Sequence, residues 1–273
     1  MPHFDLPALT LIAANYEYKA IYAVLQKTFV SNVSFVITDE DGEPAPFCLP
    51  MTAVPGQYDP SVPSLLEDDG DEETYVQQQE TYNDEPFDVY LHGNTALLLG
   101  RMTREKGSVK VVVSATKVDG VVLHFAPNGH SLNYRSCVIH GDATPVSSPE
   151  EKRYAMHLLT NHMVRRRWSS ANPVATQAMK NIQVIKVAIR SASAKTRAAN
   201  VLGLQKVTGM GERDDVWTGV LPLYEVLGEP VESGYAPERE VQSEIIMWRD
   251  TRNREERAYA EDVAVQRAPV VKD

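Results

Sequence analysis

Short runs of β-prone residues, separated by turn signals, constrain the fold of this sequence more than any other feature. Each run is rich in Val, Ile, Phe or Thr, and few segments between them have the 3.6-residue period of a helix. Consecutive runs are mostly joined by hairpins, which favours antiparallel neighbours. The pattern therefore predicts a mainly β (α+β) protein, an antiparallel barrel with peripheral helices. We expect its strands at residues 33–38, 45–51, 87–92, 108–116, 121–126, 134–146, 182–192 and 217–224.

Two of these runs carry further signals. Pro44, Pro46 and Pro50 place the second strand at an edge or a bulge, because proline has no N–H for the ladder. The segment Val118-Asp-Gly120 predicts a tight hairpin between the strands at 108–116 and 121–126.

Four helices are expected around this sheet, at residues 15–28, 95–103, 149–163 and 238–248. The third is the clearest, since Ser148 suits the N-cap, Pro149 the first position and Glu151 a capping box. It closes on Arg165-Arg-Arg167, which could bind phosphate but more simply complements the helix dipole. The second helix is expected to be capped near Asn94 or Thr95. His162, on the third helix, is expected at the edge of the core rather than as a ligand.

The domain organisation follows from changes in composition. Residues 1–235 are expected to form one domain, interrupted by an acidic insertion loop at 53–84. Residues 236–273 are expected to form a C-terminal helix and, after Arg249, a mobile charged tail.

Composition narrows the partners. The chain has 273 residues and a net charge of −10, which argues against nucleic acid and against membrane as partners. Its two cysteines imply no disulfide framework, and neither has the spacing of a metal ligand. Cys137 lies in an apolar run and is expected in the core. We see no secretory signal and no membrane-spanning run, so a cytoplasmic protein is expected.

One polar cluster stands out, at residues 128–136. It combines His130, Tyr134 and Arg135 with Ser131, Asn133 and Ser136 in one turn and the start of a strand. Arginine offers a rigid fork of donors and tyrosine a flat amphipathic ring, which suits an anionic or heteroaromatic ligand. A polar loop that satisfies its own backbone is an equally weighted alternative.

Several ordered motifs resemble one known superfamily. They are Tyr90-Leu-His-Gly93, Asp119-Gly120, His130-Ser-Leu-Asn-Tyr-Arg-Ser136, Ser193-Ala-Lys-Thr-Arg197 and Val216-Trp-Thr-Gly-Val-Leu-Pro222. Together they resemble the FMN-binding split-barrel superfamily. The nearest branch is the pyridoxamine 5'-phosphate oxidase-like flavin-nucleotide-binding proteins, which include nitroimidazole-resistance proteins. The resemblance covers residues 15–235 and is closest to fungal-looking members.

The resemblance implies a six-stranded split β-barrel and a homodimer that binds FMN between its subunits. Catalytic roles would fall to His92, His130 and Tyr134, each of which can donate a proton. The cofactor-binding residues that it implies are His92, Gly93, Thr95, Arg101, Ser131, Asn133, Arg135, Ser136, Lys195, Arg197 and Trp217.

The sequence departs from the family pattern at one place. Where members place a Ser-Arg pair that holds the FMN phosphate, this chain has Leu97 and Leu98. Apolar side chains cannot compensate a dianionic phosphate, so Arg101 or Thr95 would have to replace the pair.

Three functions stay open. The first is an FMN-dependent oxidoreductase, a flavoprotein that acts on a small organic molecule. The second is a flavin-free enzyme that performs an isomerisation or cyclisation with His130, Tyr134 and Lys195. The third is a non-catalytic protein that binds a flavin or another small molecule. Haem is a variant of the third, with His92, His124, His130 and His140 as candidate ligands, although no spacing favours it.

Overall fold

The computed structural model describes residues 15–38, 41–61, 85–94, 96–201, 215–235 and 239–266. The predictions made for Thr95 and for residues 62–84 of the acidic insertion lie outside these ranges.

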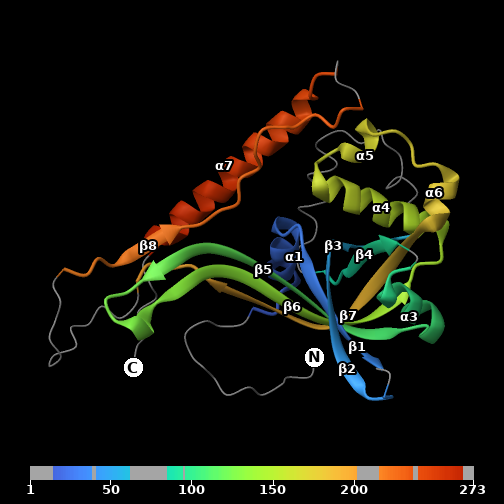
Figure 1. The fold of residues 1–273 in the computed structure, drawn as a ribbon, viewed down its shortest axis with the longest axis horizontal. Coiled ribbons are helices and arrows are strands. Elements are labelled where there is room, and N and C mark those ends of the chain that lie inside the picture. Colours follow the sequence, from blue (N-terminus) through green and yellow to red (C-terminus); the bar gives the residue numbers. More distant parts are fainter. Residues whose placement is uncertain are drawn as a thin grey trace. The chain divides into compact units, whose positions relative to one another are not determined.

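The described elements are mostly strands (Figure 1). The strands are β1 (Ser31–Thr38), β2 (Pro44–Met51), β3 (Ala53–Gly56), β4 (Asp88–Asn94), β5 (Val109–Leu123), β6 (Ser131–Pro145), β7 (Ile182–Arg197) and β8 (Gly219–Pro222). The helices are α1 (Tyr18–Lys27), α3 (Leu98–Lys106), α4 (Pro149–Met163), α5 (Arg167–Ser170), α6 (Thr176–Asn181) and α7 (Ser243–Val265), with a 3₁₀ turn at Pro127–Gly129.

The strands form one sheet in the order β2-β1-β5-β6-β7-β4-β3, and β8 pairs with β5. The pairings β1–β2, β1–β5, β3–β4, β4–β7 and β5–β8 are antiparallel. The predicted fold class is confirmed: a mostly antiparallel split-barrel sheet with peripheral helices. The described sheet has eight strands rather than the six that were expected.

The chain divides into two compact units. Among the described residues, the first unit holds 15–116 and 136–194, and the second holds 117–135 and 195–266. The long strands β5, β6 and β7 contribute residues to both units.

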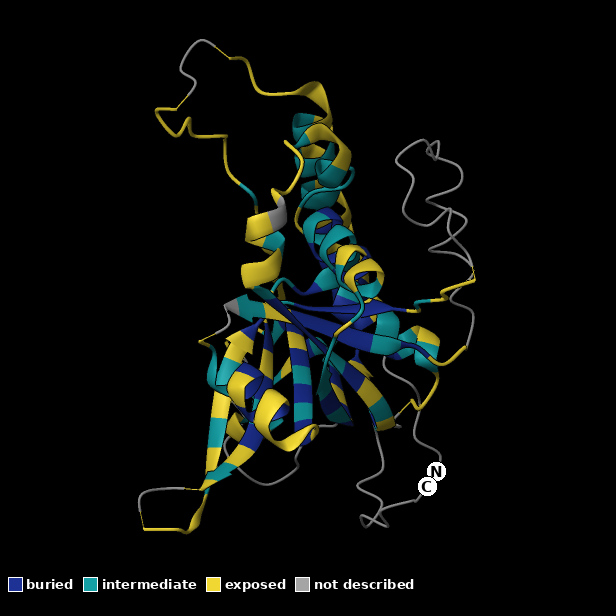
Figure 2. Cartoon of the chain, turned by 90° about the vertical axis from the view of Figure 1, so that its right-hand side faces the viewer, coloured by how far each residue is buried: buried dark blue, intermediate teal, exposed yellow. Residues whose placement is uncertain are grey.

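The first unit contains the main hydrophobic core. Ile21, Val24 and Leu25 of α1 pack in one cluster with side chains of the sheet, among them Val113 and Ile185. Buried and less buried positions alternate along β5 from Val109 to Ala115, and the buried ones belong to this core. Figure 2 shows the same alternation of buried and less buried positions along strands of the sheet. Cys137 is part of this cluster, as the sequence predicts, and burial raises the pKa of its thiol to about 12.

Helix α4 begins where the sequence places it. The Ser148 hydroxyl oxygen accepts a hydrogen bond from the Glu151 N–H at 3.1 Å, which confirms the N-cap. The second contact of a capping box, from the Ser148 N–H to the Glu151 carboxylate, does not form. The Glu151 carboxylate accepts a hydrogen bond from the Tyr90 hydroxyl at 2.9 Å and pairs with Lys186 at 2.8 Å.

The side chain of His162 confirms its reading as a histidine at the edge of the core. Its Nε2 lies 3.0 Å from the backbone oxygen of Thr28. The ring of Phe29 meets the same imidazole edge-on.

Two predictions about the strands are wrong. No hairpin forms at Val118-Asp-Gly120, because β5 runs without a break from Val109 to Leu123. Gly120 instead pairs with Pro222 of β8, and a Cβ atom at this position would lie 2.9 Å from Val220. The reversal comes later, at the 3₁₀ turn Pro127–Gly129, which joins β5 to β6. In addition, 53–56 of the predicted insertion loop form strand β3, paired with β4.

Two predictions about helix ends are also wrong. Helix α3 begins at Leu98 with Leu97 at the N-cap, so Asn94 does not cap it. The C-terminal helix does not stop at Trp248, and the charged segment after Arg249 is not a loose tail up to Val265. Helix α7 spans Ser243–Val265 as one continuous helix, drawn in red in Figure 1.

The helix α7 is long but polar. None of the described helices has the length and apolarity that crossing a bilayer requires.

Candidate functional site

The residues that the sequence predicts as a site are divided between the two units. Four belong to the first unit: His92, Gly93, Arg101 and Ser136. Eight belong to the second unit: His130, Ser131, Asn133, Tyr134, Arg135, Lys195, Arg197 and Trp217.

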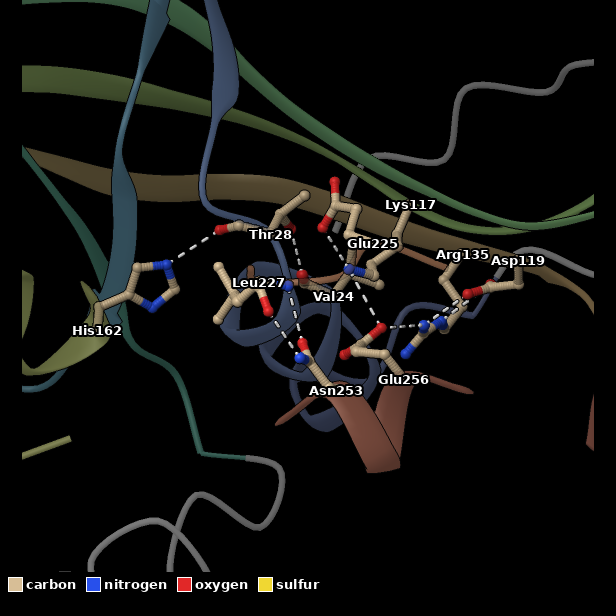
Figure 3. A network of polar contacts seen from close by, with 10 residues as sticks. All are labelled: Val24, Thr28, Lys117, Asp119, Arg135, His162, Glu225, Leu227, Asn253 and Glu256. Atoms are coloured by element: carbon tan, nitrogen blue, oxygen red, sulfur yellow. Dashed lines mark hydrogen bonds and ion pairs between the residues drawn. The ribbon is translucent and has the colours of Figure 1, made fainter. Parts of the chain in front are cut away.

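In the second unit, Arg135 is the centre of a dense ion-pair network (Figure 3). Its Nε and Nη2 donate to the two carboxylate oxygens of Asp119 at 3.0 and 2.6 Å, a bidentate pair. Nη2 also lies 3.5 Å from the carboxylate of Glu256 on α7, and the guanidinium stacks on the Tyr259 ring at 3.8 Å. Burial raises the pKa of Asp119, and the Arg135 pair counteracts that rise. The charge of Arg135 is thus already compensated within the protein.

Lys117 of β5 extends the same network. Its Nζ pairs with Glu225 at 2.7 Å and with Glu256 at 3.1 Å. The Lys117 and Glu256 side chains are only 4% and 3% exposed, whereas Glu225 is 68% exposed. The sequence did not reveal this network, since Glu256 fell in the segment interpreted as a tail and Asp119 in the predicted hairpin.

A second polar pair joins the start of β6 to the end of β7. The side chain of Asn133 is fully buried, and its Oδ1 accepts hydrogen bonds from Arg197 Nη1 at 2.6 Å and from the Ala199 N–H at 3.2 Å. Within the described part of the chain, the Nδ2 of Asn133 has no hydrogen-bond partner. A buried donor without a partner costs about 1–3 kcal/mol, so this amide is suited to an acceptor from outside the chain.

Arg197 differs from Arg135 in its charge balance. It is 7% exposed, and desolvation lowers its pKa, which the nearby Tyr134 partly opposes. Its Nη1 donates hydrogen bonds to two neutral oxygens, Asn133 Oδ1 at 2.6 Å and the Leu132 carbonyl at 3.4 Å. No carboxylate of the described ranges pairs with it. A buried cation in this state is stabilised by an anion.

The other predicted residues of the second unit are more accessible. His130 is exposed, and its Nδ1 lies 3.1 Å from the Ala126 carbonyl oxygen. If Nδ1 carries the proton, as donation to a carbonyl requires, Nε2 keeps its lone pair. Tyr134 and Ser131 are half-buried, and Lys195 is exposed. Trp217 is 61% exposed, so it is not a core residue.

In the first unit, the predicted residues lie on β4, α3 and β6. His92 is exposed near the end of β4, yet the atoms packed beside its ring lower its pKa by desolvation. Gly93 lies close to Leu97, since a Cβ atom there would be 2.7 Å from a Leu97 methyl carbon. Arg101 is exposed on α3, and Ser136 is half-buried on β6.

The leucines at the start of α3 take a structural role. Leu97 caps the helix without a side-chain hydrogen bond, and both Leu97 and Leu98 pack against the main core. Their side chains offer no charge to a phosphate. Among the described residues, His, Cys, Asp and Glu side chains do not gather in threes as a metal ion would need.

Comparison with known proteins identifies the family. The family model for pyridoxamine 5'-phosphate oxidase matches residues 17–196, about two thirds of the chain. No curated protein sequence matches the chain.

Two solved structures share most of the fold. The flavocytochrome Anf3 from Azotobacter vinelandii is 20% identical with a TM-score of 0.63, and the match covers 86% of this chain and 92% of that one. The FAD and heme binding protein from Mycobacterium smegmatis is 18% identical with a TM-score of 0.61, and the match covers 86% of this chain and 97% of that one. Both come from bacteria, so the expected fungal character stays a prediction. The chain belongs to the pyridoxamine 5'-phosphate oxidase family and has the fold of the flavin-binding split barrels.

Proposed function

We propose that this protein binds a flavin through the buried pair Asn133–Arg197 and acts as a flavin-dependent oxidoreductase on a small organic molecule. The observation that carries the proposal is the charge state of Arg197, a buried cation that no carboxylate of the described residues compensates. Membership of the family and the names of the two structural neighbours support the choice of a flavin over other anions.

The donors of this pair fit the chemistry of a flavin. The isoalloxazine ring presents carbonyl oxygens and a ring nitrogen that accept hydrogen bonds, and Asn133 Nδ2 is a buried donor without a described partner. A guanidinium also stabilises negative charge, either on a phosphate or on a reduced ring. When bound, the flavin would supply the electron transfer that no side chain can provide.

The proton donors belong to the chain. His130 and Tyr134 flank the same segment of β6 as Asn133, and each can release a proton. His92, the other predicted catalytic residue, belongs to the first unit, and its lowered pKa leaves its ring neutral near pH 7. A neutral imidazole is suited to accept a proton rather than to donate one.

The start of α3 bears on which flavin is bound. FMN ends in a phosphate monoester with close to two negative charges, and Leu97 and Leu98 provide no compensation there. FAD carries its two charges on a pyrophosphate, one on each phosphorus, so that each phosphate group needs less compensation than the FMN monoester. FMN is the family expectation, while the apolar start of α3 and the name of the Mycobacterium smegmatis protein favour FAD.

The test is a titration of the purified full chain with FMN, FAD and riboflavin, followed by visible absorption and flavin fluorescence. We expect Arg197→Gln to weaken flavin binding by about ten-fold or more, since a charge-assisted contact is lost. Arg190→Gln on the same strand is the matched control, because Arg190 is 63% exposed and pairs with Asp142. If the loss includes riboflavin, Arg197 contacts the ring, and if riboflavin is unaffected, it contacts the phosphate.

Two results would contradict the proposal. A colourless protein that takes up none of the three flavins excludes flavin binding. Equal flavin affinity in the Arg197 and Arg190 variants removes Arg197 from the site. A Soret band in the same spectrum would indicate haem, with His124 or His130 as the first ligands to replace.

The alternative is a flavin-free enzyme that performs an isomerisation or cyclisation. The apolar start of α3 favours it, because that is where the family places its phosphate-binding pair. His130, Tyr134 and Lys195 would then carry acid–base chemistry. This alternative predicts turnover that is abolished by replacing those residues and is unchanged by added flavin.

We also propose that the protein is a homodimer. The support is a group of exposed apolar side chains in the second unit, on β8, on the segments next to it and on α7. Analytical ultracentrifugation tests it, and a monomer at micromolar concentration would exclude it. These side chains are Trp217, Leu221, Leu223, Val226 and Met247, which are between 41% and 65% exposed.

A further inference from the structure

A pocket of about 360 Å³ lies in the first unit, and none of its lining residues is discussed above as a flavin ligand. Its walls are one face of α4, the short helix α5 and the segment after it. The volume is within the range of small-molecule sites, which begins at about 300 Å³. The lining residues are Arg153, Met156, Thr160, Trp168, Ser169, Ala171, Asn172, Pro173 and Val174, and we call this the α4–α5 pocket.

The chain builds this pocket by a sharp turn. Arg166 has a φ of 59°, the left-handed conformation that a residue with a side chain rarely adopts. This turn lies in the short segment 164–166 between α4 and α5, and Trp168 of α5 then packs against His157 of α4. Positive φ at a residue other than glycine is a cost that the surrounding structure must offset.

Neighbouring residues fix the position of Trp168. Its backbone N–H donates to the buried Oδ1 of Asn161 at 2.9 Å, and Asn161 Nδ2 lies 3.0 Å from His157 Nε2. The indole ring meets the His157 ring edge-on at 6.0 Å. The aromatic wall of the pocket is therefore held in place before any ligand arrives.

Charge and shape together define what the pocket can hold. Arg153 is the one charged side chain among the nine lining residues, all of which are described. Its guanidinium carbon lies 5.6 Å from the centre of the Trp168 ring, so a cation borders a flat apolar surface. Thr160, Ser169 and Asn172 add neutral polar groups, while Met156 and Val174 add apolar area.

We propose that the α4–α5 pocket binds a small carboxylate with a flat apolar body, of the class of aromatic acids. Arg153 pairs with the carboxylate, because a guanidinium matches its two oxygens. Trp168 contacts the ring face, and Met156 and Val174 contact the rest of the body. This site is separate from the flavin proposal and does not depend on it.

The experiment is a calorimetric titration of the full chain with benzoate, compared with benzyl alcohol and inorganic phosphate. Benzyl alcohol keeps the ring without the charge, and phosphate keeps the charge without the ring. We expect benzoate to bind at least about ten-fold more tightly than either, because only benzoate uses both parts of the pocket.

Variants locate the binding. Arg153→Gln is expected to weaken benzoate binding by about ten-fold or more, whereas Arg239→Gln, the same change at an exposed arginine of the second unit, is expected to leave it unchanged. Ala171→Trp fills the pocket and is expected to abolish binding, and circular dichroism checks that each variant is folded. Equal affinity for benzoate and benzyl alcohol, no effect of Arg153→Gln, or no benzoate binding at all would overturn the proposal.

Discussion

The ion-pair network of the second unit leads to a sharp prediction about Glu256. Its carboxylate is 3% exposed and lies 3.1 Å from Lys117 Nζ and 3.5 Å from Arg135 Nη2. At these distances and an effective dielectric constant of about 20, the attraction to each cation is about 5 kcal/mol. Most of it offsets the loss of hydration that burying three charges causes, so the gross attraction overstates the net contribution.

Replacing Glu256 by glutamine removes the attraction but leaves both cations buried. We expect Glu256→Gln to lower the free energy of unfolding by about 3–5 kcal/mol, the range for one partner removed from a buried pair. The remaining pairs, Arg135 with Asp119 and Lys117 with Glu225, place the value toward the lower end.

Urea unfolding followed by circular dichroism measures this loss, with Glu261→Gln as the matched control. Glu261 lies on the same helix and pairs with Arg257 at 2.8 Å, but the two side chains are 51% and 62% exposed. Such a surface pair contributes about 0.5 kcal/mol or less. If the two variants unfold at the same urea concentration, the buried network does not stabilise α7 as argued.

A double replacement tests the same reasoning from the other side. Lys117→Met combined with Glu256→Leu removes both charges and fills the space with apolar atoms. We expect this pair to cost less than Glu256→Gln alone, because Lys117 is removed together with its buried partner and Arg135 keeps Asp119. A larger cost for the double variant would mean that the network is needed for more than charge compensation.

Three further predictions concern other parts of the chain. The pKa of the Cys137 thiol is about 12 in the folded protein and 9.0 when unfolded, so the free energy of unfolding falls as pH rises above 9. Between pH 9 and 11, the wild type should lose about 2 kcal/mol more than Cys137→Ala in urea unfolding. Desolvation lowers the pKa of His92, so NMR should show its imidazole titrating below 6.5. A midpoint at or above 6.5 would contradict the desolvation of this ring. Ser148→Ala should destabilise the protein by about 1 kcal/mol in thermal unfolding through loss of the α4 cap, with Ser170→Ala, near the end of α5, expected to cost less.

The sequence predicts secondary structure best where it is set by neighbouring residues. Ser148 and Pro149 mark the start of α4 because capping depends only on neighbouring residues. The segments of β1, β5 and β7 have enough branched apolar residues to be expected as strands, although β5 was expected as two shorter strands.

The wrong predictions arise where distant contacts override a local signal. Asp119-Gly120 has the composition of a hairpin, but Asp119 is used to pair with Arg135 and Gly120 to admit β8. Helix α7 has no apolar stripe because its buried positions are Ala260, Val263, Ala264 and the charged Glu256. The Glu256 carboxylate is buried because it pairs with Lys117 and Arg135, which lie far away in the sequence. Its burial therefore cannot be predicted from the sequence of α7 alone.

At the candidate site, too, local sequence predicts the segments but not the contacts between distant residues. The sequence placed candidate site residues at β6 and the end of β7, and it gave Arg135 and Arg197 similar weight. Only the structure distinguishes them, since Arg135 has two carboxylates beside it and Arg197 has none among the described residues. Which side chains pair with an arginine depends on the tertiary fold. The residues next to that arginine in the sequence do not reveal it.

The prolines of β2 have a consequence for how this protein behaves at high concentration. β2 is the last strand at its end of the described sheet, and it stays paired with β1 over all eight residues. Pro44, Pro46 and Pro50 are separated by even numbers of residues, so their missing N–H groups face the same side, away from β1. A strand from another molecule would find few donors there, which protects this edge from fibril-like growth. Replacing the three prolines by threonine would keep the fold and expose the chain to aggregation.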